Sequence, residues 1–128
     1  MSFVLLAAAL ATQPQKTVLH ANWRTCVVHG KTNLDFAACG EIYVRAADAG
    51  LNVQWSRISA AADPATKAAL LREQRAWLAY RVQVCAFYGL QVQWGREGEV
   101  LHRPECVAQV IERRTKELAD YRAFIAAK

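Results

Sequence analysis

The chain has 128 residues, a length that suits one domain of ordinary size and excludes a two-domain architecture. Hydrophobic residues make up 54% of it and charged residues 21%, so the chain can bury a core and is neither disordered nor of low complexity. Sixteen Lys and Arg against eleven Asp and Glu give a net charge of +5, which favours anionic partners without choosing among nucleic acid, lipid headgroups and cell-envelope polymers.

The start of the chain has the character of a secretory signal. Residues 1–11 are apolar except for one serine, and residues 9–11 have the small-x-small form of a cleavage site before Thr12. No charged side chain precedes Lys16, so the usual basic segment is missing, and a buried N-terminal helix is the alternative. No apolar run reaches the roughly 20 residues of a membrane-spanning helix. We therefore expect a signal peptide or its remnant at residues 1–11, followed by an N-terminal segment at residues 12–34.

Helical periodicity predicts three long helices in the rest of the chain. Apolar and small side chains recur at steps of three and four in residues 35–62. An N-cap and a first-turn proline at residues 63–64 begin a second helix, which should stop near Gly89, and Pro104 opens a third. Because there is no strand pattern and no internal repeat, residues 35–128 are expected to form an all-α domain, a small three-helix antiparallel bundle.

The segment between the second and third helices is the candidate contact region. Residues 89–103 contain three glycines and charges of both signs without a sustained period, which predicts a loop or a short hairpin through residues 90–94. Loops can enter concave sites, and Trp and Arg often carry the binding energy of an interface. We therefore expect this loop to contact a binding partner. For Trp94, packing inside the protein is the alternative role. The candidate contact residues are Trp94, Arg96, Glu97 and Glu99.

The four cysteines are Cys26, Cys39, Cys85 and Cys106. An even number in a short chain of an oxidising compartment indicates two disulfides, with three possible connectivities. No CxxC or CxxCH motif supports a thioredoxin-type site, a zinc ribbon or a c-type haem. Cys85 and Cys106 can face each other across the predicted antiparallel helices. The preferred pairs are therefore Cys26 with Cys39 and Cys85 with Cys106, and the other pairings remain open.

Three pieces of sequence resemble a known family. The first is the nine residues ADAGLNVQW from Ala47. The second is the eight residues QRAWLAYR from Gln74, with Cys85 four residues after the final Arg81. The third is Cys106 followed by Arg114 and Leu118. In this order they resemble the secreted lysozyme inhibitor LprI-like N-terminal domain family of bacterial envelope proteins, over about residues 26–118. The resemblance implies a periplasmic or secreted, cysteine-bridged helical domain. It implies lysozyme inhibition for part of the family only, because most members have no assigned activity.

The polar residues among these pieces have a structural interpretation. Asp48 and Asn52 lie one turn apart on the first predicted helix, and Gln74 and Arg81 lie two turns apart on the second. Arg114 falls within the apolar stripe of the third helix. Because an unpaired buried charge is too costly, we hypothesise that these five residues form a structural polar network in which Asp48 contacts Arg81. A ligand-binding arginine is the functional alternative.

No pattern points to catalysis or to a cofactor. Two Cys/His pairs, Cys26 with His29 and His102 with Cys106, could supply four ligands, but their spacing does not match a common zinc site. The serines lack a recognisable nucleophile motif, two loop acids alone do not make a glycosidase, and no Gly-rich phosphate loop occurs. The basic cluster at residues 113–116 is diluted by acids and lacks a DNA-binding motif, so nucleic-acid binding is not expected.

The sequence thus predicts an exported binding protein and not an enzyme. The resemblance makes lysozyme or a related peptidoglycan hydrolase its most concrete partner, with an anionic envelope polymer as a further candidate. An envelope binding or assembly module without a hydrolase target is the alternative, and a basic nucleic-acid-binding helical protein is the third class. Animal-type lysozymes are commonly basic, so the +5 chain would be repelled unless an acidic patch such as Glu97 with Glu99 meets the enzyme.

Overall fold

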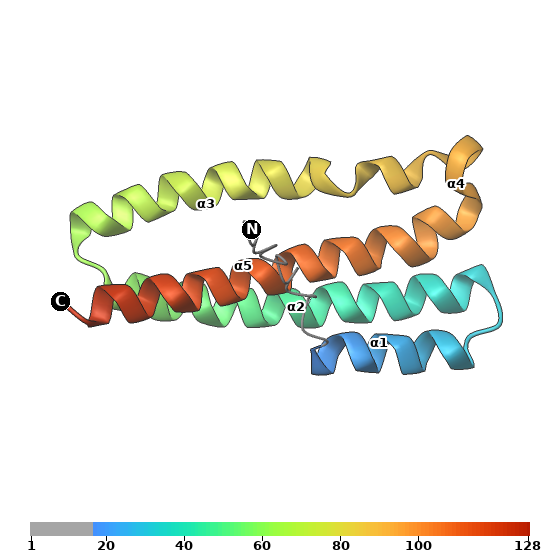
Figure 1. Ribbon diagram of the computed structural model, residues 1–128, viewed down its shortest axis with the longest axis horizontal. Coiled ribbons are helices and arrows are strands. Elements are labelled where there is room, and N and C mark those ends of the chain that lie inside the picture. The colour runs from blue at the N-terminus through green and yellow to red at the C-terminus, as the bar shows by residue number, and fades with distance from the viewer. Residues whose placement is uncertain (1–16) are drawn as a thin grey trace, which may run out of the picture.

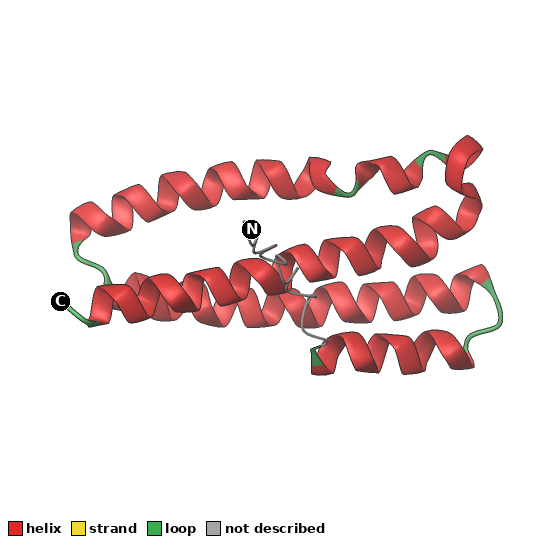
Figure 2. Cartoon of the chain, in the orientation of Figure 1, coloured by secondary structure: helices red, strands yellow, loops and turns green. Residues whose placement is uncertain are grey.

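The computed structural model describes residues 17–128, which form four long helices and three short ones (Figure 1). The long helices are α1 (Val18–His29), α2 (Asn33–Ala61), α3 (Pro64–Val84) and α5 (Arg103–Ala126). The short ones are the 3-10 helix η1 (Ala86–Gly89), α4 (Gln91–Glu97) and the π-helix η2 (Gly98–His102). The described residues contain no strand, which confirms the all-α class (Figure 2). The signal prediction for residues 1–11 lies outside the described residues.

The prediction of three helices is wrong, because the N-terminal segment also contains a helix. Helix α1 begins after Thr17, whose hydroxyl oxygen accepts the backbone N–H of His20. It is 12 residues long and buries a single side chain fully, that of Trp23, so its apolar pattern is too short to stand out in the sequence. The other three long helices begin within two residues of their predicted positions.

The prediction for residues 89–103 is also wrong. Most of this segment is neither an open loop nor a hairpin but folds into the short helices α4 and η2. The glycines that predicted a loop have a different effect, because they permit a kink and close packing between two short helical turns.

Most of the core lies between α2 and α5, which run parallel to each other, while α3 runs antiparallel to both (Figure 1). Contacts across the α2/α5 pair advance in the same direction on both helices, from Gly40 beside Pro104 to Tyr43 beside Glu112. The buried residues on these helices recur at helical spacing and include Tyr43, Ala47, Leu51 and Ile58 on α2, and Ala108, Ile111 and Leu118 on α5. This shared apolar seam is the hydrophobic centre of the molecule.

Helix α1 packs on α2, on the side away from α3 (Figure 1). The imidazole of His20 lies 2.7 Å from a carboxylate oxygen of Glu105 on α5 and stacks on the ring of Trp23. The hydroxyl of Tyr43 donates a hydrogen bond to Glu112. Burial, followed by this carboxylate, raises the pKa of Tyr43, so the phenol keeps its proton at neutral pH. His20 thus joins α1 to α5, Trp23 joins α1 to α2 through its contact with the ring of Tyr43, and Tyr43 joins α2 to α5.

The preferred cysteine pairs are confirmed. Cys26 is bonded to Cys39, with 5.8 Å between the Cα atoms, and Cys85 is bonded to Cys106, with 6.0 Å between them. The first bridge joins the end of α1 to the start of α2, and the second joins the end of α3 to the start of α5. Each bridge limits the freedom of the unfolded chain and typically adds about 2 to 4 kcal/mol to the stability of a small domain.

Two helical glycines on α2 should respond oppositely to the same substitution. A Cβ atom at Gly50 would lie 4.0 Å from Cγ2 of Thr115 on α5, whereas one at Gly40 would lie 2.5 Å from Cβ of Pro104. We predict that Gly50→Ala stabilises the protein by about 1 kcal/mol, because alanine favours the helix and the site has room. Gly40→Ala should destabilise it by about 1 to 3 kcal/mol, because α2 and α5 must separate. Chemical denaturation would measure both, and a stabilising Gly40→Ala would contradict the close packing.

The N-cap of α3 should give a pH-dependent contribution to stability. Hydrogen bonds from the backbone N–H and the hydroxyl of Thr66 lower the pKa of Asp63. Because its folded-state pKa is lowered, the stabilisation is complete above the ordinary carboxyl pKa and is lost as the pH falls through the folded-state pKa. We predict that Asp63→Ala lowers the melting temperature at pH 7 and that the difference shrinks in acid. A difference that stays constant down to strongly acidic pH would contradict this assignment.

Candidate protein-binding surface

The chain reverses direction at one end of the molecule, between α3 and α5, in the segment that carries the predicted contact residues. Gly95 has a φ of 65°, a left-handed conformation that side chains disfavour, and it introduces a kink within α4. Two turns must then approach closely, because a Cβ atom at Gly98 would overlap the carbonyl oxygen of Tyr88 and Cβ of Trp94. The glycines therefore fold this end into a compact tip.

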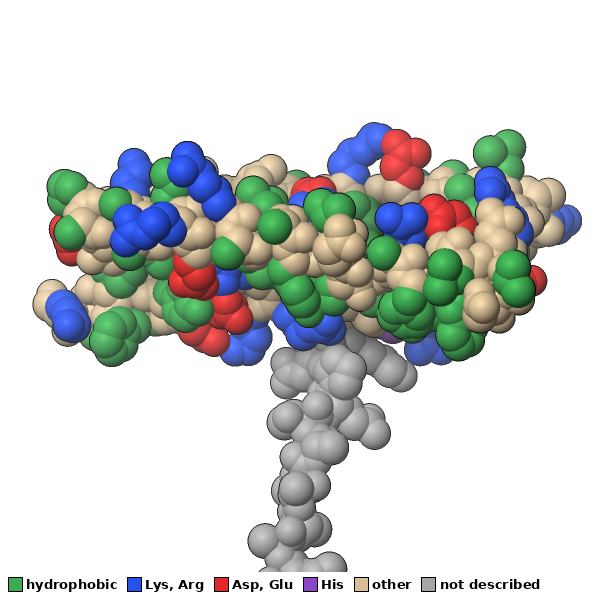
Figure 3. Space-filling model, turned by 90° about the horizontal axis from the view of Figure 1, so that it is seen from above, with side chains coloured by type: hydrophobic (Ala, Val, Ile, Leu, Met, Phe, Trp, Pro, Cys, Tyr) green, Lys and Arg blue, Asp and Glu red, His purple; other side chains and the backbone are tan. Residues whose placement is uncertain are grey.

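This tip carries a group of large apolar side chains, which we call the aromatic end. Its residues are the exposed Phe87, Leu90, Val92 and Trp94 and the half-buried Tyr88. The rings of Phe87 and Tyr88 have their centroids 4.1 Å apart, and Trp94 meets both rings edge-on at 6.2 Å. Nevertheless Trp94 remains 49% exposed and Val92 96% exposed. Figure 3, which looks onto the face that carries α3, shows hydrophobic side chains gathered at this end. Clustered exposed aromatic side chains are typical of a protein-binding surface.

The charged residues predicted for this region have different surroundings. Arg96 and Glu97 are exposed on α4. Glu99 instead lies partly buried and accepts hydrogen bonds of 3.0 and 3.2 Å from Arg103 one turn later. The acidic patch expected from Glu97 and Glu99 is therefore reduced, because Arg103 neutralises one of its two carboxylates.

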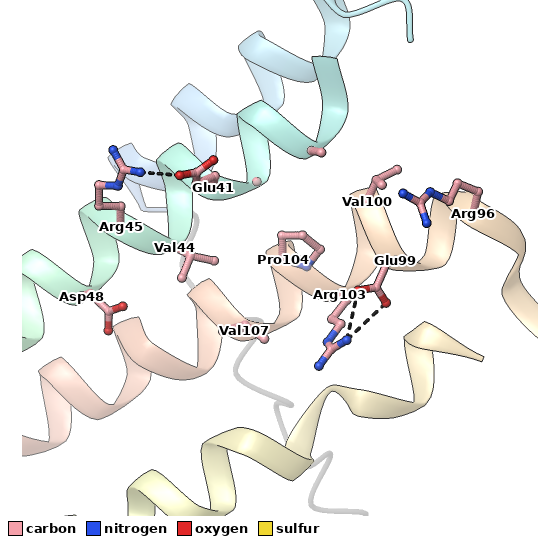
Figure 4. A pocket seen from close by; sticks show the side chains of 12 residues that line it. Glu41, Val44, Arg45, Asp48, Arg96, Glu99, Val100, Arg103, Pro104 and Val107 are labelled. Carbon is pink, nitrogen blue, oxygen red and sulfur yellow. Dashed lines mark hydrogen bonds and ion pairs between the residues drawn. The ribbon is translucent and has the colours of Figure 1, made fainter. Parts of the chain in front are cut away.

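A groove lies behind the aromatic end, between α2 and the turn into α5 (Figure 4). Its volume is about 630 Å³. Val44, Val100, Pro104 and Val107 give it apolar lining, and arginines and carboxylates surround them, with Arg45 beside Glu41 and Arg103 beside Glu99. Charges of both signs balance around this groove, so it shows no preference for an anionic or a cationic ligand.

The hypothesised contact between Asp48 and Arg81 is confirmed. The two guanidinium nitrogens of Arg81 donate to the two carboxylate oxygens of Asp48 at 2.7 and 2.9 Å, which is the bidentate geometry that favours Arg over Lys. Asn52, which was expected in the same network, is exposed on α2 and makes no hydrogen bond within the described side chains. Arg81 donates both of its terminal guanidinium nitrogens to Asp48, and Asn52 remains exposed to solvent.

Arg114 is the centre of a second polar cluster. Its side chain is 2% exposed, and its Nε donates to the amide oxygen of Gln74 at 3.0 Å. Nη1 pairs with Glu73 at 2.7 Å and also with Glu117, while Tyr121 donates to both carboxylates. Burial alone would lower the pKa of Arg114, but the two carboxylates outweigh it and raise that pKa. Arg114 therefore stays charged and links α3 to α5.

Sequence analysis missed three members of this cluster, Glu73, Glu117 and Tyr121. The available signal was spacing, since Glu117 lies three residues after Arg114 and Tyr121 lies four residues after Glu117. Trp77 also contributes, because the guanidinium carbons of Arg81 and Arg114 lie 6.0 and 5.8 Å from its ring. Both arginines are engaged by the protein itself, which favours the structural interpretation over a ligand-binding arginine.

The residues described include no group of three or more His, Cys, Asp or Glu side chains placed to hold a metal ion. Cys26 and Cys106, the two cysteines considered as ligands, are each joined in a disulfide, and His29 bonds instead to the carbonyl oxygen of Thr25. In the same part of the chain, no helix is both long enough and apolar enough to cross a membrane.

Fold and site together define a small disulfide-bridged helical protein with an exposed aromatic tip, a class suited to binding another macromolecule. A comparison with protein families matches residues 26–118 to the family described as lysozyme inhibitor LprI. Because the match covers most of the sequence, the chain belongs to this family. No curated protein and no solved structure matches the chain.

The Asp48–Arg81 pair should be energetically coupled, unlike a more exposed pair on α2. The side chains of Arg81 and Asp48 are 24% and 33% exposed, whereas those of Arg45 and Glu41 are 76% and 67% exposed. We predict a coupling free energy of about 1 kcal/mol from the double-mutant cycle of Asp48→Ala and Arg81→Ala. The matched cycle of Glu41→Ala and Arg45→Ala should give about 0 to 0.5 kcal/mol. Equal coupling free energies in the two cycles would show that the Asp48–Arg81 pair is no stronger than an exposed ion pair.

Proposed function

We propose that this protein is an exported inhibitor of lysozyme or a related peptidoglycan hydrolase and that it contacts the enzyme through the aromatic end. The observation that carries the proposal is the match to the lysozyme inhibitor LprI family over residues 26–118. An inhibitor needs a surface that binds the enzyme, and the exposed aromatic and apolar side chains of the tip offer such a surface.

The aromatic end has the properties of an interface hot spot. Trp and Tyr bury large areas with few rotatable bonds, so they lose little conformational entropy on binding. At the tip, Trp94 already contacts Phe87 and Tyr88 and is thereby held in one orientation. The Cys85–Cys106 bridge, with Cys85 1% exposed, fixes the base of the tip on α5. A preorganised tip of this kind can enter a concave surface without first becoming ordered.

The charge of the protein limits which hydrolases it is expected to bind. The net charge of +5 repels a strongly basic enzyme at long range, and only Glu97 at the tip offers a carboxylate without an arginine partner among the described residues. A neutral or acidic hydrolase therefore fits the surface better than a strongly basic one. The two disulfides support a periplasmic or secreted location, because such bridges persist in oxidising compartments.

The test is hydrolysis of cell walls by a panel of lysozymes and related hydrolases of different net charge, with and without the oxidised protein. We predict dose-dependent inhibition of at least one enzyme, with the less basic enzymes inhibited more strongly at low salt. A folded, oxidised protein that inhibits none of them would contradict the proposal and would favour an envelope module without a hydrolase target.

Variants then locate the contact surface. We predict that Trp94→Ala and Val92→Asp each weaken inhibition by about tenfold or more, because they remove an anchor or place a charge in the interface. Val28→Asp is the matched control, because Val28 is 80% exposed on α1, which packs on the side of α2 away from α3 (Figure 1). Unchanged inhibition by Val92→Asp, or an equal loss with Val28→Asp, would exclude the aromatic end as the contact surface.

A further inference from the structure

Helix α3 carries an exposed stripe in which basic and apolar side chains alternate. Lys67, Leu71, Arg75, Leu78 and Val82 follow one another at steps of four, four, three and four, so they lie along one side of the helix. Leu78 is 45% exposed and Val82 is 66% exposed, and Arg72 adds a further cation beside the stripe. We call these six residues the α3 stripe.

The positive charge of the α3 stripe has no neutralising partner within the described residues. Only two carboxylates lie on this helix or at its cap, Glu73 and Asp63. Glu73 binds Arg114 and Tyr121 on α5, and Asp63 accepts its hydrogen bonds from Thr66. Neither pairs with Lys67, Arg72 or Arg75, so the stripe presents three cations to the outside.

The way in which α3 is attached to its neighbours explains why several of its apolar side chains remain exposed to solvent. Helix α3 buries only Leu70 and Gln74 fully and is held to its neighbours by Arg81, by Arg114 and by the Cys85–Cys106 bridge. Its inner face therefore combines Leu70 and the half-buried Trp77 with polar groups, and much of its remaining apolar surface faces solvent. Exposed apolar side chains are unfavourable in water, so their alignment beside three cations indicates a partner that is both anionic and apolar.

The shape of the surface distinguishes between such partners. Peptides and partner helices usually dock in grooves, and the groove described above is lined by residues of α2, α4, η2 and α5 and by none of α3. Helix α3 instead lies at the edge of the molecule (Figure 1), and the residues of the stripe on it are exposed. A lipid surface can contact a convex helix along its length, with apolar side chains entering the acyl boundary while Lys and Arg extend to the headgroups.

We propose that the α3 stripe is a docking surface for an anionic lipid bilayer and holds the protein peripherally on the membrane. Electrostatic attraction brings Lys67, Arg72 and Arg75 to the headgroups, and Leu71, Leu78 and Val82 insert between them. This activity is separate from hydrolase inhibition and does not depend on it.

The experiment is sedimentation of the full oxidised chain with phospholipid vesicles. One preparation contains phosphatidylglycerol mixed with phosphatidylcholine, and the other contains phosphatidylcholine alone. We predict binding to the anionic vesicles that weakens as salt is raised, and little binding to the neutral vesicles. No binding to anionic vesicles at low salt, by protein with a native circular dichroism spectrum, would overturn the proposal.

Matched variants test each part of the stripe. Arg75→Glu should reduce the vesicle partition coefficient by about fivefold or more, whereas Arg24→Glu, the same change on α1 away from α3, should leave it within about twofold. Val82→Gln should reduce it by about threefold or more, whereas Val28→Gln on α1 should not. An equal effect of Arg75→Glu and Arg24→Glu would show that net charge alone causes binding and would overturn the assignment to α3.

A soluble polyanion distinguishes a membrane from an envelope polymer. Suppose that the protein binds dextran sulfate as tightly as it binds anionic vesicles and that Val82→Gln weakens neither interaction. The partner is then a charged polymer, and the lipid proposal is wrong. A loss of vesicle binding in Val82→Gln with unchanged polyanion binding would support insertion of the stripe.

Discussion

Parallel helices cannot be joined by a short turn, so the pairing of α2 with α5 forces the chain to travel back along the bundle before α5 begins. That pairing buries most of the core, and at Gly40 it brings α2 so close to Pro104 that no side chain fits between them. Helix α3 is the returning connection, and the tip formed by η1, α4 and η2 reverses its direction. The two surfaces with proposed functions therefore both lie on the connection between the central helices.

The attachment of α3 differs from that of α1. Helix α1 inserts Trp23 into the aromatic and apolar contacts of α2, whereas α3 is held largely by charged hydrogen bonds that converge on Arg81 and Arg114. Desolvation offsets part of the attraction in such partly buried ion pairs, so their main contribution is to specify the register of α3. Polar attachment also leaves the apolar side chains of α3 unused by the core, which makes them available to a partner.

The second disulfide connects the fold to the proposed inhibitory function. It joins the last residues before the tip to the first turns of α5, so the aromatic end cannot separate from the central helices while the bridge is intact. Exposed aromatic side chains on a mobile loop would lose conformational entropy on binding, whereas the same side chains on a bridged helical tip lose less. The oxidised state is therefore expected to favour both stability and recognition.

The sequence by itself determined the helical class and the starts of three helices, because these depend on local periodicity and capping. It favoured the two cysteine pairs and the contact of Asp48 with Arg81, but the structure was needed to decide them. It did not reveal α1, whose single buried tryptophan gives no lasting period, or the helical character of the tip, where tertiary contacts outweigh the local preference of glycines for loops. Only the tertiary structure decided that Asn52 faces solvent, that Arg103 neutralises Glu99 and that Arg114 is shared by Glu73 and Glu117. These outcomes depend on how helices distant in the chain are placed beside one another, and no spacing within one helix contains that information.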